Sequence, residues 1–373
     1  MTSWNYFKTR FGRPFVLSAH GLFKLRQKRW SLLTYLSFLI SIPFLAEGRH
    51  DATFSLDLRQ FGWKARNSHS FRVDYSNVTF LSDSLLLVIV NQKSFVEPLA
   101  PETKVVPNSK LFIFDLHRRE VSRTADVPAL QLPQSVLATR SGKFAMLSIA
   151  GLQLCSAQLD CGTALHTPGP MAVSPRGSKI IIGGYAGTRQ TLVDADTMKP
   201  IEELPGGESV IPGDIALLVH KENYLYLQKD HTQVPLPLSV FPAQFVNDQL
   251  IVGFRERNGA VVFGSDGLLR YTLAAKNGLR NREIVFTTCS SGTRFVISES
   301  GYTKGNSLVH FFDIDQARPL NYQRIRVVDS DTGRIVFDKT LDPGAYLTWP
   351  ALSPDAHTFA MLTNGKVEVF ELP

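Results

Sequence analysis

The 373-residue chain has only three cysteines and none of the short motifs that mark the common catalytic sites. It has no Gly-x-Ser-x-Gly elbow, phosphate-binding glycine loop or dinucleotide fingerprint, so these motifs give no support to a serine hydrolase, a kinase or a dehydrogenase. The nine histidines are scattered without His-x-His or His-x-x-x-His spacing, and no paired cysteine motif accompanies them. We therefore expect no zinc or redox-metal site and assign no cofactor.

Acidic residues are absent from positions 1–30, which hold seven Lys and Arg residues. The next stretch, 31–46, is uncharged and mostly apolar, but it is shorter than the roughly 20 residues that span a bilayer. We predict a basic n-region at 1–30 and a signal-peptide core or membrane anchor at 31–48, with cleavage before Arg49. Cleaved export is preferred, followed by export with an uncleaved anchor and by an apolar segment buried in a cytosolic protein.

Most of the net charge of +7 belongs to residues 1–48. Residues 1–48 hold seven basic residues and one acidic residue, which leaves 33 of the 40 basic and 32 of the 33 acidic residues for 49–373. No basic stripe is left to favour a nucleic-acid partner. We predict one domain over 49–373 that is secreted or periplasmic and monomeric, with membrane contact only through 31–46 if that segment stays uncleaved.

A hairpin pattern recurs along the rest of the chain. Ile325–Leu341 places two β-branched runs around an Asp-Ser-Asp-Thr-Gly turn, and Thr191–Leu204 repeats it with Asp194, Asp196 and Thr197 at matching positions. A second pattern, with a polar turn before a strongly apolar strand, precedes each hairpin, as in Met171–Gly184 and Pro350–Gly365. Seven units of four strands follow, and repeats of about 40 to 45 residues of this kind are typical of β-propellers.

The repeats resemble the YVTN and WD40-like families over most of Val78–Pro373, although the Gly-His and Trp-Asp dipeptides of true WD40 repeats are missing. We predict an all-β fold, a β-propeller of seven four-stranded blades closed by an N-terminal strand from 52–58 or 70–76. A pair of β-sandwiches or a β-helix is the alternative. The resemblance implies a binding scaffold or an enzyme of the lactonase, glycosidase or quinoprotein type, with an active site at the central channel.

Two insertions interrupt the repeat, Asn91–Ser109 in the first blade and Ser300–Arg324 in the sixth. Both separate second and third strands, so they emerge on one side of the ring over consecutive blades. We predict that this side binds a protein or carbohydrate partner, and that the exported chain is a binding or scaffold module rather than an enzyme. The candidate binding residues are Phe95, Glu97, Glu102, Arg318, Tyr322, Tyr346 and Trp349.

Two smaller patterns admit a structural interpretation. Asp331-Thr332-Gly333 matches the aspartic-protease triplet, but the equivalent Asp196-Thr197-Met198 does not, and that chemistry needs two carboxylates. We interpret the triplet as a hairpin turn, and the spacing also lacks the ligands of a calcium loop. Cys155 and Cys161 flank another turn and can form a disulfide in an oxidising compartment, whereas Cys289 is expected as a small apolar residue.

Overall fold

The structure is a computed structural model. It describes residues 51–61, 77–91, 108–128, 136–148, 151–165, 171–183, 189–204, 210–219, 224–227, 232–236, 242–255, 259–275, 282–302, 320–341, 349–363 and 365–373. The chain divides into the units Met1–Gly48 and Arg49–Pro373, and all described residues belong to the second. Among them, no helix has the length and apolar character needed to cross a membrane.

The described residues form seven antiparallel sheets, one for each predicted blade. Blade 1 contains β2 (Asn77–Phe80), β3 (Leu85–Asn91), β4 (Asn108–Asp115) and β5 (Glu120–Pro128), and blade 2 contains β6 (Val136–Ala138), β7 (Phe144–Ser148) and β8 (Gly151–Cys155). Blade 3 contains β9 (Met171–Val173), β10 (Lys179–Gly183), β11 (Gln190–Asp194) and β12 (Pro200–Leu204), and blade 4 contains β13 (Val210–Pro212), β14 (Ala216–Val219), β15 (Tyr224–Leu227) and β16 (Thr232–Pro235). Blade 5 contains β17 (Ala243–Phe245), β18 (Leu250–Arg255), β19 (Gly259–Gly264) and β20 (Leu269–Leu273), and blade 6 contains β21 (Arg282–Thr288), β22 (Arg294–Tyr302), β23 (Leu320–Asp329) and β24 (Ile335–Leu341). Blade 7 contains β25 (Trp349–Leu352), β26 (Thr358–Thr363), β27 (Lys366–Glu371) and β1 (Phe54–Asp57), and two short 3-10 helices, η1 (Leu58–Phe61) and η2 (Arg140–Gly142), complete the described elements.

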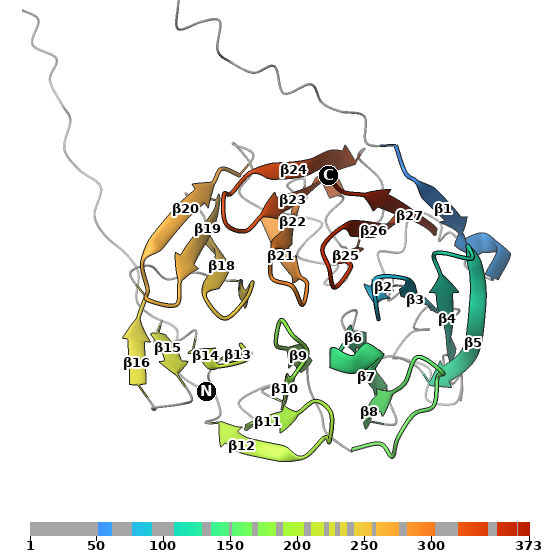
Figure 1. Cartoon of the computed structure of the whole chain (residues 1–373), viewed down its shortest axis with the longest axis horizontal. Helices are drawn as coiled ribbons and strands as arrows, with labels where there is room; N and C mark the ends of the chain where they lie inside the picture. Colours follow the sequence, from blue (N-terminus) through green and yellow to red (C-terminus); the bar gives the residue numbers. More distant parts are fainter. Residues whose placement is uncertain are drawn as a thin grey trace, which may run out of the picture. The chain divides into compact units, whose positions relative to one another are not determined.

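The sheets follow one another in sequence order around a ring, with the first strand of each blade innermost (Figure 1). The predicted all-β, seven-bladed propeller is thus confirmed. Two sides of the ring are named here. The turn side carries the turns between first and second and between third and fourth strands, and the connection side carries the second-to-third connections and the links between blades.

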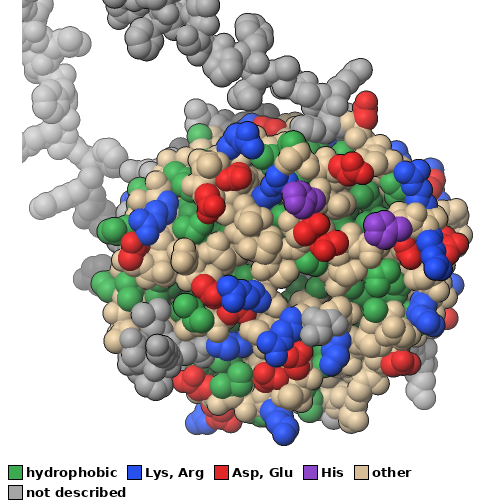
Figure 2. Space-filling model, in the orientation of Figure 1, with side chains coloured by type: hydrophobic (Ala, Val, Ile, Leu, Met, Phe, Trp, Pro, Cys, Tyr) green, Lys and Arg blue, Asp and Glu red, His purple; other side chains and the backbone are tan. Residues whose placement is uncertain are grey.

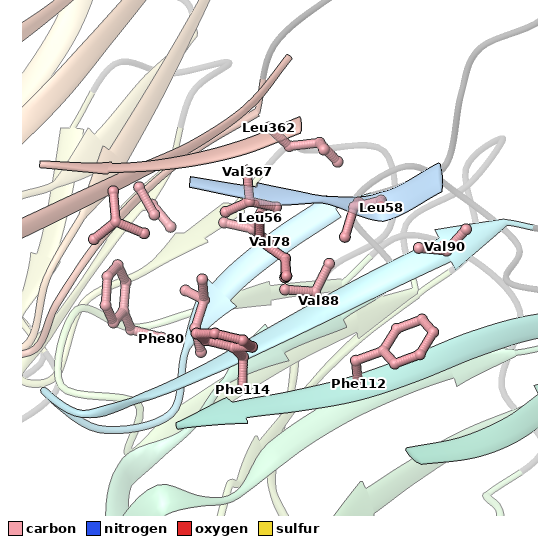
Figure 3. Close-up of a cluster of buried hydrophobic side chains, with 14 residues drawn as sticks. Leu56, Leu58, Val78, Phe80, Val88, Val90, Phe112, Phe114, Leu362 and Val367 are labelled. Atoms are coloured by element: carbon pink, nitrogen blue, oxygen red, sulfur yellow. The ribbon is translucent and has the colours of Figure 1, made fainter. Parts of the chain in front are cut away.

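The N-terminal strand closes the ring. β1 pairs antiparallel with β27, from Phe54 opposite Val369 to Asp57 opposite Lys366. Leu56 and Leu58 then pack with residues of blades 1 and 7 in one apolar cluster (Figure 3). Of the two closing segments predicted from the sequence, 52–58 is the one that pairs, and 70–76 lies outside the described residues.

The blades are apolar at nearly every inner position because both faces of each sheet are buried. In β3, Leu86 and Val88 face the cluster shared with blade 7, whereas Leu87 and Ile89 join the cluster shared with blade 2. All four side chains are at most 1% exposed. The core is therefore a series of interfaces between neighbouring blades, and side-chain alternation decides which neighbour each residue contacts.

The repeated residues close turns on the turn side. In the hairpin of blade 3, Asp194 accepts hydrogen bonds from the amide and hydroxyl of Thr197, both at 2.8 Å. In the turn after β9, the buried hydroxyl of Ser174 accepts from the amide of Lys179 at 3.1 Å, and Ser353 does the same for Thr358 at 2.9 Å in blade 7. The similarity between the repeats therefore reflects turn chemistry.

Two blades depart from the predicted pattern. In blade 2 no regular fourth strand is described, and residues 161–165 occupy its place through two isolated bridges, Leu152 to Leu165 and Cys155 to Cys161. In blade 6 the predicted insertion was too long. β22 and β23 continue their ladder to Tyr302 opposite Leu320, so the connection covers only 303–319.

Candidate functional site

The predicted binding residues divide into two groups. Tyr322 is described completely, and for Trp349, the first residue of β25, only the backbone is described. The other five lie outside the described residues: Phe95, Glu97, Glu102, Arg318 and Tyr346. Whether these side chains share a common surface therefore stays a prediction.

Tyr322 is buried between blades 5 and 6, with 3% of its surface exposed. Its hydroxyl donates to Oε1 of Glu299 at 2.7 Å, and Oε2 of Glu299 lies 3.6 Å from Nη2 of Arg326. Arg326 also donates to the carbonyl of Ala274, in the link after blade 5, at 3.0 Å. Burial lowers the pKa of Arg326. Because it belongs to this interior network, Tyr322 does not offer the surface contact predicted for it.

The two cysteines predicted to pair are joined by a disulfide, with an S–S distance of 2.03 Å between Cys155 and Cys161. Cys155 is 1% exposed and Cys161 lies at the surface. Cys289 carries no disulfide and is buried directly after β21.

The central channel forms a cavity in the described structure. It has a volume of about 630 Å³ and is lined by the first strands of all seven blades. The partly exposed side chains on its wall are aliphatic, hydroxyl or amide groups: Thr79, Leu137, Ala138, Ala172, Val173, Ile211, Gln244, Val285, Thr287 and Thr288. Gln244 donates to the hydroxyl of Thr288 at 3.1 Å, which joins blades 5 and 6 across the wall.

Among the described residues, the charged residues that line the channel lie in turns between first and second strands, where the channel opens on the turn side. Asp83, Arg140 and Arg176 are the charged residues among those that line the channel. Figure 2 shows charged side chains of both signs around the hollow at the centre of the ring. Among the described residues, no group of three or more His, Cys, Asp or Glu side chains is arranged to hold a metal ion.

The two arginines of this rim form ion pairs with aspartates of other blades. Arg140 pairs with Asp196 of blade 3. Arg176 reaches past blade 4 to Asp248 of blade 5, with Nη2 and Oδ2 2.9 Å apart. The hydrogen bond that Arg140 donates to Asp196 raises the pKa of the Arg140 guanidinium.

Blade 4 is tied to blade 3 at the same rim. The carboxylate of Asp214 accepts from the hydroxyl of Ser174 at 2.7 Å and from the amide of Arg176 at 3.1 Å. Its carbonyl accepts from Nζ of Lys179 at 2.5 Å, and burial lowers the pKa of this lysine. The acidic group here therefore joins two blades and is not open toward the channel.

Similar contacts continue around the turn side. Asn247 donates to the carbonyl of Gly292 at 3.0 Å, which joins blades 5 and 6. Arg294 donates to the carbonyl of Ala356 at 3.0 Å, which joins blades 6 and 7. The amide of Asp355 donates to Asp83 at 2.8 Å and links blade 7 to blade 1. The polar groups of this side thus hold the ring together.

The sequence reasoning missed the rim residues Arg140, Arg176 and Asp248. The repeat alignment contained a usable signal, because all three fall in the turn between first and second strands where Asp83 and Asp355 also lie. Their function was hidden because each partner comes from a different blade, and spacing within one repeat does not reveal such a contact.

On the connection side, blades 1 and 6 have the longest third strands. β4 has eight residues and β23 has ten, whereas the third strands of the other five blades have four to six. At about 3.3 Å per residue, β23 exceeds the third strand of blade 7 by roughly 13 Å. Blades 6, 7 and 1 are consecutive, since β25 contacts both β21 and β2.

Comparisons with known proteins identify no family for this chain. No protein-family model matches the chain, and no curated protein matches it. Among solved structures, BBS1N in complex with ARL6DN is 11% identical, with a TM-score of 0.47 over 86% of this chain and 96% of that chain. KlHsv2, with its loop 6CD replaced by a Gly-Ser linker, is 11% identical, with a TM-score of 0.47 over 78% and 90%. Dihydro-heme d1 dehydrogenase NirN in complex with DHE is 14% identical, with a TM-score of 0.41 over 82% and 62%. Likeness at this level carries no information on function.

Proposed function

We propose that this chain is an exported β-propeller of the YVTN/WD40-like kind that binds a protein or carbohydrate partner on the connection side of blades 6, 7 and 1. The observation that carries the proposal is the contrast between the two sides of the ring. On the turn side, the rim arginines form ion pairs with other blades, as Arg176 does with Asp248. On the connection side, the longest third strands, β4 and β23, directly follow the two long connections, 92–107 and 303–319.

The channel chemistry favours binding over catalysis. A lactonase, glycosidase or quinoprotein-like enzyme needs titratable or metal-binding groups that converge on its substrate. The described wall between the rims offers aliphatic side chains, threonine hydroxyls and the amide of Gln244. These groups provide a surface for contact, but they supply neither a general acid nor a nucleophile activated by a base.

Export is supported by the disulfide. Disulfides persist in oxidising compartments and are rare in the cytosol. The Cys155–Cys161 bond therefore agrees with the basic segment and apolar run that precede Arg49. Mass spectrometry of the intact native protein tests this, because a cleaved chain starts at Arg49, an anchored chain retains 31–46, and recovery from the cytosol with reduced cysteines refutes export.

The partner face is tested by shortening the two connections. Blade 7 closes the same position with two residues, Asn364 and Gly365, between β26 and β27. We would replace 92–107 and 303–319 by Asn-Gly, separately and together, and use each protein as bait for envelope or secreted extracts and for a glycan array. Partner loss in either variant supports the proposed face.

The matched control replaces 256–258, the connection of blade 5, by the same Asn-Gly turn. It changes the connection side outside blades 6, 7 and 1, and we expect it to retain the partner. Equal loss in the control, or full retention in the double replacement, contradicts the proposed face.

A further inference from the structure

The wall of the central channel exposes branched apolar side chains to a narrow space. Leu137, Val173, Ile211 and Val285 come from four different blades, and all four are only partly buried. Apolar side chains elsewhere in these strands, such as Ile284 and Phe286, are buried between blades at 5% and 7% exposure. The ring therefore leaves a distinct apolar surface at its centre.

This surface has the features of a small-molecule site. A volume of about 630 Å³ falls within the roughly 300 to 1,000 Å³ of ligand pockets, which combine apolar lining with a few polar groups. Here the polar groups are the hydroxyls of Thr79 and Thr287 and the amide of Gln244. A guest that covers the aliphatic wall removes its apolar surface from water, which is favourable.

The charge distribution restricts the guest. The described wall has no charged side chain between its rims, so an ionised group inside the channel would lose hydration without gaining a counter-ion. The rim charges do not replace that counter-ion, because Arg140 and Arg176 are each paired with an aspartate. An anionic or cationic ligand is therefore disfavoured within the channel.

We infer that the central channel binds a neutral, mainly apolar small molecule with one hydrogen-bonding group, a site separate from the proposed partner face. The aliphatic side chains of several blades surround the apolar body of this molecule. A threonine hydroxyl or the amide of Gln244 takes its polar group.

Three probes with the same chain and different charge test this inference: 1-decanol, decanoate and decylammonium, titrated into the full-length protein by calorimetry. We expect saturable binding of one 1-decanol per chain, with both ions at least about tenfold weaker. Absence of saturable 1-decanol binding, or equal binding of all three probes, overturns the inference.

Substitutions inside and outside the channel test where 1-decanol binds. Val285→Arg places a charged side chain in the channel and should weaken 1-decanol binding about tenfold or more. Thr272→Arg introduces the same charge on the exposed outer strand of blade 5 and should leave binding unchanged. If Val285→Arg does not fold, the near-isosteric Val285→Thr decides the question, with an expected loss of about threefold. Unchanged affinity in the channel variant overturns the site.

Discussion

Asp329 and Thr332 are joined by two hydrogen bonds across one hairpin turn. Oδ1 of Asp329 accepts from the backbone amide of Thr332 at 3.0 Å and from its hydroxyl at 2.7 Å. The same two donors act on Asp194 in blade 3, where the partner is Thr197. The triplet that matches aspartic proteases is therefore part of a turn in which the first aspartate, outside the triplet, accepts the hydrogen bonds.

Replacement of Thr332 by valine should make blade 6 less stable and less sensitive to acid. The hydrogen bond from the Thr332 hydroxyl holds the pKa of Asp329 below its ordinary value of 3.8. Because the folded-state pKa is the lower one, the stabilisation is present above the unfolded pKa and is lost as pH falls through the folded pKa. At pH 7 we expect Thr332→Val to lower the free energy of unfolding by about 1 kcal/mol.

Urea unfolding of both proteins at neutral pH and at pH values on either side of 3.8 checks this. The difference between wild type and variant should shrink in acid. Thr340→Val, at an exposed position of β24, is the matched control and should behave as wild type. A difference that stays constant with pH would show that the bond to Asp329 does not carry the effect.

Replacement of Arg119 by glycine should raise the stability of the protein. It lies in the exposed turn between β4 and β5 with φ of 56°, a left-handed conformation that strains residues other than glycine. In the corresponding turn of blade 6, Gly333 has φ of 70°. We expect Arg119→Gly to raise the free energy of unfolding by about 0.5 to 1 kcal/mol, since part of the relief is offset by the greater freedom of glycine in the unfolded chain.

Gly333→Ala, which adds a side chain at the corresponding position of blade 6, is the comparison. A Cβ atom at Gly333 would lie 3.0 Å from the ring of Tyr271 in blade 5, so Gly333→Ala combines backbone strain with a close contact. It should lower the melting temperature, whereas Arg119→Gly should raise it. A lower melting temperature for Arg119→Gly would refute the strain argument.

The fold could be predicted from the sequence because it depends on residue patterns within each repeat. Strands with both faces buried are apolar throughout, and turns such as the one at Asp329 keep their local hydrogen-bonding residues. The rim was not predictable in this way, because Arg176 and Asp248 lie two blades apart and meet only once the ring closes. Tyr322 was misplaced for a related reason. The ladder of β22 and β23 runs further than the pattern indicated, and Tyr322 lies within it.

Leu58 should be essential for the stability of the whole ring. It is fully buried at 0% exposure in the cluster that the closing segment shares with blades 1 and 7. Truncation to alanine removes this packing at the junction, and we expect a loss of about 2 to 5 kcal/mol in urea unfolding. The loss should appear as one transition, because the junction connects the first and last blades.

Arg59→Ala is the control for Leu58→Ala. Arg59 is adjacent in sequence and its side chain is 71% exposed, and its ion pair with Asp57 should contribute little. If Leu58→Ala is no more destabilising than Arg59→Ala, closure by the N-terminal segment does not limit the stability of the ring.

The Cys155–Cys161 disulfide should act on one blade alone. The disulfide takes the place of part of the ladder that a regular fourth strand would form in blade 2. Residues 161–165 are otherwise held at the outer edge of this blade by the Leu152–Leu165 bridge and a few hydrogen bonds, including the one from the amide of Gly162 to the carbonyl of Leu154 at 2.9 Å. A bond that closes so short a loop contributes about 2 kcal/mol by restricting the unfolded chain. Reduction should therefore open 156–165 and leave the neighbouring blades paired.

Hydrogen exchange of the oxidised protein and of a Cys155→Ala/Cys161→Ala variant measures this directly. We expect faster exchange at the amides of Gly162 and Leu165, with the amides of β10 and β11 in blade 3 unchanged. The variant also separates loss of the bond from effects of the reductant, which should have no further action on it. Faster exchange in every blade would mean that the disulfide stabilises the ring as a whole, because an opening confined to the outer edge of blade 2 leaves the interfaces between blades in place.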